Sequence, residues 1–108
     1  DDLLAEVLMD MARTETQPRT ERLAVALETA IKAGDLKMHR HPRQQAGFSV
    51  LKSADIPSVL LELGFLSSPG DLGRLEDPAW RGRMAAAISA GLQAWAGEDA
   101  GLQALPLK

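Results

Sequence analysis

The chain has 108 residues, 45% hydrophobic and 25% charged, a composition that argues against an intrinsically disordered protein. Twelve basic and fifteen acidic side chains leave a formal charge of −3, which makes nucleic acid an unfavourable main partner. No apolar run approaches the roughly 20 residues of a membrane-spanning helix. The absence of cysteine excludes disulfides and thiolate metal sites.

The first residues have the pattern of an amphipathic helix. Leu4, Val7, Leu8 and Met11 recur at helical spacing and predict a helix over residues 2–13. The chain begins without an initiator Met or a signal-peptide core, so we expect a fragment or a processed form.

A second helix is expected from Thr20 to Lys32 after a polar connector over residues 14–18. Its apolar residues Leu23, Leu27 and Ile31 share one face, and Gly34 is expected to cap its end.

Two short apolar runs predict β-strands. Phe48–Leu51 is the first, and Ser58–Phe65, entered through Pro57, is the second. The second run is almost continuously apolar, which is typical of a strand buried on both faces. The linker over residues 52–56 is too short for a crossover helix, so the strands are either antiparallel neighbours or not adjacent.

The last part of the chain is expected to be helical. After a turn over residues 67–71, a short helical piece is expected over Leu72–Leu75. Asp77 and Pro78 predict a helix start, and the helix is expected to run to about Ala96 and stop at Gly97. Its apolar stripe indicates core packing rather than a sugar platform; it consists of Trp80, Met84, Ile88, Leu92 and Trp95.

These elements predict an α/β fold, to which the chain supplies about two strands and three helices. Two strands seldom form a stable sheet alone, which again suggests part of a domain.

Glu62 is the residue that does not fit a buried strand. It is the only charged residue between Ile56 and Pro69, and an unpaired carboxylate is costly to bury. It lies near the carboxyl end of the expected strand, where sites in open α/β sheets lie, just before Gly64. A functional carboxylate, a structural ion pair with an arginine, and a carboxylate simply at the edge of the sheet all remain open at this point.

The segment Ile56-Pro57-Ser58-Val59-Leu60-Leu61-Glu62-Leu63-Gly64-Phe65-Leu66-Ser67 resembles the C-terminal signature of the zinc-dependent N-acetylmuramoyl-L-alanine amidases. These are bacterial cell-wall amidases of the sporulation and cell-division type. Residues 46–52 resemble the family's preceding strand, Asp77–Trp80 the start of its closing helix, and residues 3–16 the helix after its last metal histidine. The resemblance assigns residues 1–97 to the C-terminal half of one amidase domain and residues 98–108 to a tail.

The resemblance implies a three-layer α/β domain with helices packed on a mixed sheet. It implies cleavage of the amide between N-acetylmuramic acid and the L-alanine of the stem peptide, so that peptidoglycan is the substrate. It also implies one zinc ion held by two histidines and a glutamate, with Glu62 as general base and acid toward the zinc-bound water. The implied location is the periplasm or cell wall, with a cell-division activator protein as a further partner.

The main departure from the family pattern concerns the metal. The family's zinc ligands have no counterpart here and are expected upstream of Asp1, so this chain alone is expected to be inactive. Ser68 stands where many members have Asn.

His39 and His41 are the other candidate ligands, because a His-x-His pair can present both rings on one face. They lie among Lys37, Arg40 and Arg43, and cations disfavour a bound metal, so solvated loop histidines are the preferred interpretation. The three cations are also candidates for contact with an anionic glycan or stem carboxylate, although such loops are more often solvated.

Two further hypotheses remain beside the amidase. One is a non-catalytic amidase-like fragment or interaction module without a metal site. The other is an unrelated α/β domain in which Glu62 forms a structural ion pair. In cell-division members of the family, an insertion just before this region carries a helix that covers the active site. The resemblance therefore also admits a regulatory role for residues 1–13 as the C-terminal flank of that insertion, with plain packing as the preferred alternative.

Overall fold

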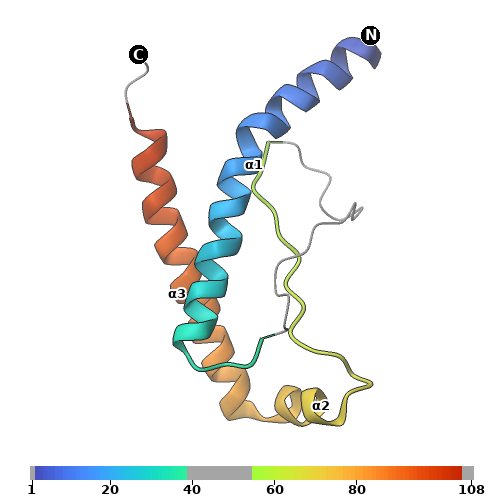
Figure 1. Cartoon of the computed structure of the whole chain (residues 1–108), viewed down its shortest axis with the longest axis vertical. Helices are drawn as coiled ribbons and strands as arrows, with labels where there is room; N and C mark the ends of the chain where they lie inside the picture. Colours follow the sequence, from blue (N-terminus) through green and yellow to red (C-terminus); the bar gives the residue numbers. More distant parts are fainter. Residues whose placement is uncertain (1, 39–54, 106–108) are drawn as a thin grey trace.

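Three helices make up the regular structure of residues 2–38 and 55–105, the parts of the chain that this computed structural model describes. α1 spans Asp2–Ala33, α2 spans Pro69–Glu76 and α3 spans Pro78–Gln103. α1 and α3 run in opposite directions and pack on each other over part of their length (Figure 1). α2 lies near the end of this pair at which α1 finishes and α3 begins.

α1 is one continuous helix, whereas the sequence predicts two helices with a connector over residues 14–18. Proline lacks the N–H of an intrahelical hydrogen bond and favours a break or a kink. The helix nevertheless continues through Pro18, and side-chain contacts flank this point. Thr14 Oγ1 donates to the Asp10 carbonyl at 2.9 Å, and Gln17 Nε2 donates to Glu21 Oε1 at 3.1 Å.

The core lies where α1 meets α3. Its buried apolar members are Leu23, Leu27, Ile31, Leu36, Trp80, Met84 and Ala87, and Ile31 is the least exposed of them at 2%. The predicted inward faces are confirmed at Leu23, Leu27 and Ile31 of α1 and at Trp80 and Met84 of α3. The prediction is wrong at Leu92, which belongs to the expected packing stripe of α3 but is 44% exposed. Gly91 marks a close approach, since a Cβ there would lie 3.1 Å from the Leu27 Cα and the Ala26 carbonyl oxygen.

The end of α1 returns the chain to this core. The Asp35 N–H donates to the Lys32 carbonyl at 3.0 Å, and the Leu36 N–H donates to the Ile31 carbonyl at 3.3 Å, the pattern of a Schellman motif. Gly34 follows the last helical residue as expected, but the left-handed residue is Asp35, with a φ of 54°. The motif places Leu36 in the core cluster with Ile31.

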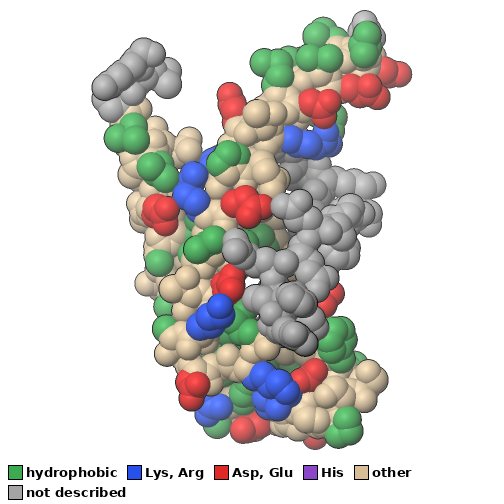
Figure 2. Space-filling model, viewed as in Figure 1, with side chains coloured by type: hydrophobic (Ala, Val, Ile, Leu, Met, Phe, Trp, Pro, Cys, Tyr) green, Lys and Arg blue, Asp and Glu red, His purple; other side chains and the backbone are tan. Residues whose placement is uncertain are grey.

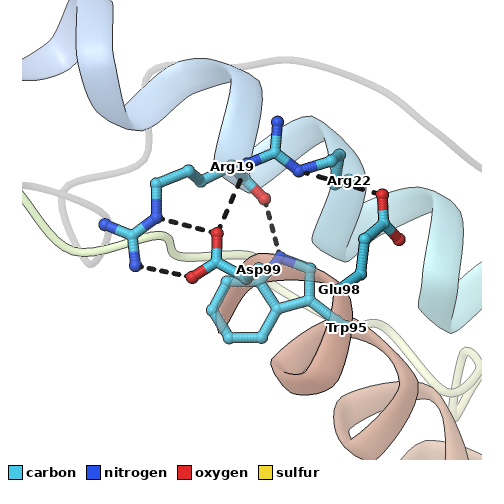
Figure 3. A network of polar contacts seen from close by, with 5 residues as sticks. All are labelled: Arg19, Arg22, Trp95, Glu98 and Asp99. Carbon is cyan, nitrogen blue, oxygen red and sulfur yellow. Dashed lines mark hydrogen bonds and ion pairs between the residues drawn. The ribbon is translucent and has the colours of Figure 1, made fainter. Parts of the chain in front are cut away.

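α3 continues to Gln103 instead of ending near Ala96. Glycine in a helix interior costs about 1 kcal/mol relative to alanine, a penalty that tertiary contacts can outweigh. Figure 3 shows such contacts on both sides of Gly97. Trp95 Nε1 donates to the Arg19 carbonyl at 2.9 Å, and Asp99, which is buried, accepts two hydrogen bonds from the Arg19 guanidinium at 2.9 and 3.0 Å.

Arg22 joins the same network from the next turn of α1. Its Nη2 donates to Asp99 Oδ1 at 3.3 Å, and its Nε lies 4.0 Å from Glu98 Oε1. The Arg19 hydrogen bond is the main cause that lowers the pKa of Asp99 below its ordinary value. The ionised carboxylate therefore ties the far end of α3 to α1.

The expected α/β architecture is wrong for this structure. Residues 2–38 and 55–105 contain no strand, so they show neither a mixed sheet nor three layers. Residues 58–65, expected as a buried strand, carry no regular secondary structure, and Leu66 beyond them is 74% exposed. A strand requires backbone hydrogen bonds to a neighbour, and no described segment supplies one. The other expected strand, Phe48–Leu51, lies outside the described residues.

Apolar side chains remain exposed on two parts of the molecule outside the α1–α3 core. One is the N-terminal arm of α1, over residues 2–11, where Figure 2 shows a concentration of hydrophobic side chains. The other is the segment 56–66. Within the described ranges, no helix combines the length and apolarity needed to cross a bilayer.

Candidate functional site

Glu62 lies in the extended segment that leads into α2. Its side chain is exposed, and no hydrogen bond or ion pair joins it to another described residue. The hypothesis of a structural ion pair with an arginine therefore finds no support in the described part of the chain. A carboxylate in this setting is accessible to water and to a substrate.

The backbone turns a few residues after Glu62, at Leu66 and Ser67. Gly64 has a φ of 157°, a conformation that residues with a side chain rarely adopt. The next residue, Phe65, has both of its backbone polar groups engaged. Its N–H donates to Asp71 Oδ2 at 3.0 Å, and its carbonyl accepts from the Ser68 N–H at 3.0 Å.

Ser68 begins α2 as its N-cap. Its Oγ accepts a hydrogen bond from the Asp71 N–H at 3.3 Å, and Pro69 occupies the first helical position. Serine and asparagine are both strong N-caps, so Ser68 can begin a helix as well as an Asn would. The predicted helical piece over Leu72–Leu75 is confirmed, and the helix begins three residues earlier, at Pro69.

Asp71 was missed by the sequence analysis. Its carboxylate accepts from Phe65 and also forms an ion pair with Arg74. The Phe65 N–H, followed by Arg74, lowers the pKa of Asp71, and Lys37 adds a weaker attraction. The spacing Ser68-x-x-Asp71 is that of a capping box, which signals the helix start from sequence. The reach of Asp71 back to Phe65 has no such signal.

α2 is joined in turn to α3. The Asp77 N–H donates to the Arg74 carbonyl at 3.1 Å, and the Arg81 guanidinium donates to the Leu75 carbonyl at 2.8 Å. Leu75 packs against the core cluster. Asp77 caps α3 as predicted, since its side chain accepts from the Ala79 N–H at 3.0 Å. The turn after Glu62 is therefore connected to the packed core.

The described residues do not form a metal site. Among residues 2–38 and 55–105, no group of three or more His, Cys, Asp or Glu side chains has the arrangement needed to hold a metal ion. His39, His41, Arg40 and Arg43 lie outside the described residues, and Lys37 is exposed at their border. Trp80 is buried in the core, as predicted for a packing residue.

Comparison with known proteins identifies relatives over most of the chain. A family profile described as N-acetylmuramoyl-L-alanine amidase matches residues 5–94. The N-acetylmuramoyl-L-alanine amidase AmiA of Salmonella typhimurium is 38% identical over 92 residues, which cover 85% of this chain and 32% of the relative. The probable cell wall amidase LytH of Staphylococcus epidermidis is 41% identical over 75 residues, 69% of this chain and 25% of that protein.

A third relative, the amidase AmiC of Escherichia coli, is 38% identical over 66 residues, which cover 61% of this chain and 16% of its own length. No solved structure matches the chain. The chain thus spans about a third or less of the length of these relatives. The profile match includes Glu62, Asp71 and most of both packed helices, and it shows that the chain belongs to the N-acetylmuramoyl-L-alanine amidase family.

Proposed function

We propose that the protein containing this chain is a peptidoglycan hydrolase. It cleaves the amide bond between the lactyl group of N-acetylmuramic acid and the L-alanine of the stem peptide. The family match over residues 5–94 carries the proposal. Because the peptidoglycan lies outside the cytoplasmic membrane, the proposed place of action is the periplasm or the cell wall.

Glu62 is the proposed general base and acid. A carboxylate beside the attacked amide can accept a proton from water and then deliver one to the departing nitrogen. The exposed side chain of Glu62, free of ion pairs to other described residues, supports this role. The turn after it supports the role further, because a proton-transfer group acts well only when its position is restricted.

The proposal includes zinc in the complete protein, since the family is generally zinc-dependent. The described residues do not fit a zinc site, so we propose that the ligands are other residues of the protein. A cell-division activator as a further partner stays a prediction, as does a regulatory role for residues 1–13.

The test uses the full-length gene product that contains this sequence, incubated with purified peptidoglycan. Mass spectrometry is expected to find stem peptides with a free N-terminal L-alanine and glycan strands that keep their lactyl groups. A chelator is expected to abolish this release, and added zinc to restore it. Cleavage of only glycosidic or peptide bonds would contradict the proposal. Binding to peptidoglycan without release by the zinc-loaded protein would favour the non-catalytic interaction module instead.

A further inference from the structure

The backbone beyond Glu62 is held by one side chain of α2. Asp71 Oδ2 accepts the Phe65 N–H at 3.0 Å, although six residues separate the two in sequence. The other polar group of Phe65, its carbonyl, is taken by the Ser68 N–H. Only Leu63 and Gly64 lie between this fixed point and Glu62.

Gly64 is fitted against the same aspartate. A Cβ at Gly64 would lie 3.1 Å from the Asp71 Cβ and 3.3 Å from its Cγ, so a larger residue would push the two segments apart. The φ of 157° adds a backbone reason for glycine. The absence of a side chain at Gly64 therefore allows Asp71 to reach the Phe65 N–H.

Asp71 is itself held from the opposite side. Its second carboxylate oxygen pairs with Arg74, and its own N–H donates to the Ser68 Oγ. The side chain of Asp71 is mostly buried, with 21% of its surface exposed. α2, which carries it, is fixed to α3 through the Arg81–Leu75 hydrogen bond and the packing of Leu75.

We propose that Asp71 is a positioning residue of the amidase reaction, which sets the direction in which the segment presents the Glu62 carboxylate. The inference rests on the proposed function, because it has meaning only if Glu62 transfers protons. Asp71 touches no reacting atom in this account. It acts through the Phe65 N–H and the close contact with Gly64.

The expected kinetic signature follows from that indirect role. A displaced proton-transfer group lowers turnover but leaves ground-state binding of the substrate largely intact. An asparagine at position 71 keeps an oxygen that can accept the Phe65 N–H, although it loses the ion pair with Arg74. An alanine loses both contacts.

The experiment measures kcat and KM on peptidoglycan for the full-length, zinc-loaded protein and its variants. Asp71→Ala is expected to lower kcat by about 10- to 100-fold with little change in KM. Asp71→Asn is expected to recover most of the lost kcat. Asp77→Ala is the matched control, because Asp77 also accepts one backbone N–H at a helix start but does not contact the turn after Glu62. It is expected to lower the melting temperature without lowering kcat.

Gly64→Ala is a second test that leaves the carboxylate in place. It crowds Asp71 and is expected to lower kcat in the same way as Asp71→Ala. The inference is overturned if Asp71→Ala and Gly64→Ala both fold and retain wild-type kcat. It is also overturned if Asp71→Ala and Asp77→Ala lower activity only in parallel with stability. Glu62→Gln distinguishes a failure of the positioning role of Asp71 from a failure of the proposed function of Glu62. An inactive Glu62→Gln beside a fully active Asp71→Ala refutes the positioning role alone, whereas an active Glu62→Gln refutes the proposed function of Glu62.

Discussion

The α1–α3 pair and the segment 56–66 are both rich in apolar residues, yet they differ in exposure. Leu27 in the pair is 6% exposed, whereas Leu66 in the segment is 74% exposed. A helix satisfies its backbone hydrogen bonds internally and needs a partner only for one face. An extended segment needs a neighbouring strand for its backbone as well. An apolar run therefore indicates burial only where a partner is present.

The same substitution in the two regions gives the largest expected contrast in stability. Leu27→Ala removes a buried side chain and leaves a cavity, so the free energy of unfolding is expected to fall by about 2–5 kcal/mol. Leu66→Ala is the matched control and is expected to change it by less than about 0.5 kcal/mol. Denaturant unfolding of the full-length variants measures both, and an equal loss in the two variants would contradict the contrast.

Two glycines of α3 test the close approach of the helix pair. Gly91→Ala would place a methyl group 3.1 Å from atoms of α1, and such overpacking costs about 1–3 kcal/mol. Gly97→Ala meets no atom within 4 Å and is expected to stabilise the protein by about 0.5–1 kcal/mol through helix propensity. Thermal unfolding distinguishes the two, and stabilisation by both substitutions would show that α1 and α3 lie farther apart than described.

The hydrogen bonds of Asp99 with Arg19 and Arg22 predict a smaller effect on stability, which depends on pH. The pKa of Asp99 is lowered in the folded protein, so its contribution to stability is present above its unfolded pKa, near 3.9, and is lost as pH falls through the folded pKa. Asp99→Asn is therefore expected to lower the melting temperature by a few degrees at neutral pH. The difference from wild type should shrink progressively below about pH 4.

The control for this effect is the exposed ion pair of the α1 arm. Asp10 pairs with Arg13 at 2.9 Å, with side chains 76% and 52% exposed. Exposed pairs contribute little, so Asp10→Asn is expected to leave the melting temperature almost unchanged at either pH. A difference between Asp99→Asn and wild type that persists at acid pH would show that packing, and not the charge, carries the contribution of Asp99.

The helices could be predicted from sequence because their signals are local. The cap at Asp77 and the inward face of Leu23, Leu27 and Ile31 follow from spacing and residue type. The continuation of α1 through Pro18 and of α3 past Gly97 could not be predicted in this way. The extension of α3 accompanies contacts between residues about 80 positions apart, such as Arg19 with Asp99.

The candidate site likewise has one feature that the sequence predicts and others that it does not. Glu62 is recognisable because it is a lone charge in an apolar run, a feature of composition. The exposure of the apolar run around it was not predicted, because the run was expected to form a buried strand and no described neighbour pairs with it. The contact of Asp71 with Phe65 depends on the φ of Gly64 and on the turn into α2, and neither is encoded by the spacing of the residues.

The central claim is that the Glu62 carboxylate performs chemistry and does not support the fold. The most direct test measures turnover and melting temperature of Glu62→Gln in the same preparation of the full-length protein, with Glu76→Gln, an exposed glutamate at the end of α2, as control. Glu62→Gln is expected to lower turnover by about 10²–10⁴-fold at an unchanged melting temperature and zinc content. Glu76→Gln should change neither quantity. A Glu62→Gln protein that retains wild-type turnover, or loses it only in step with its stability, would contradict the claim.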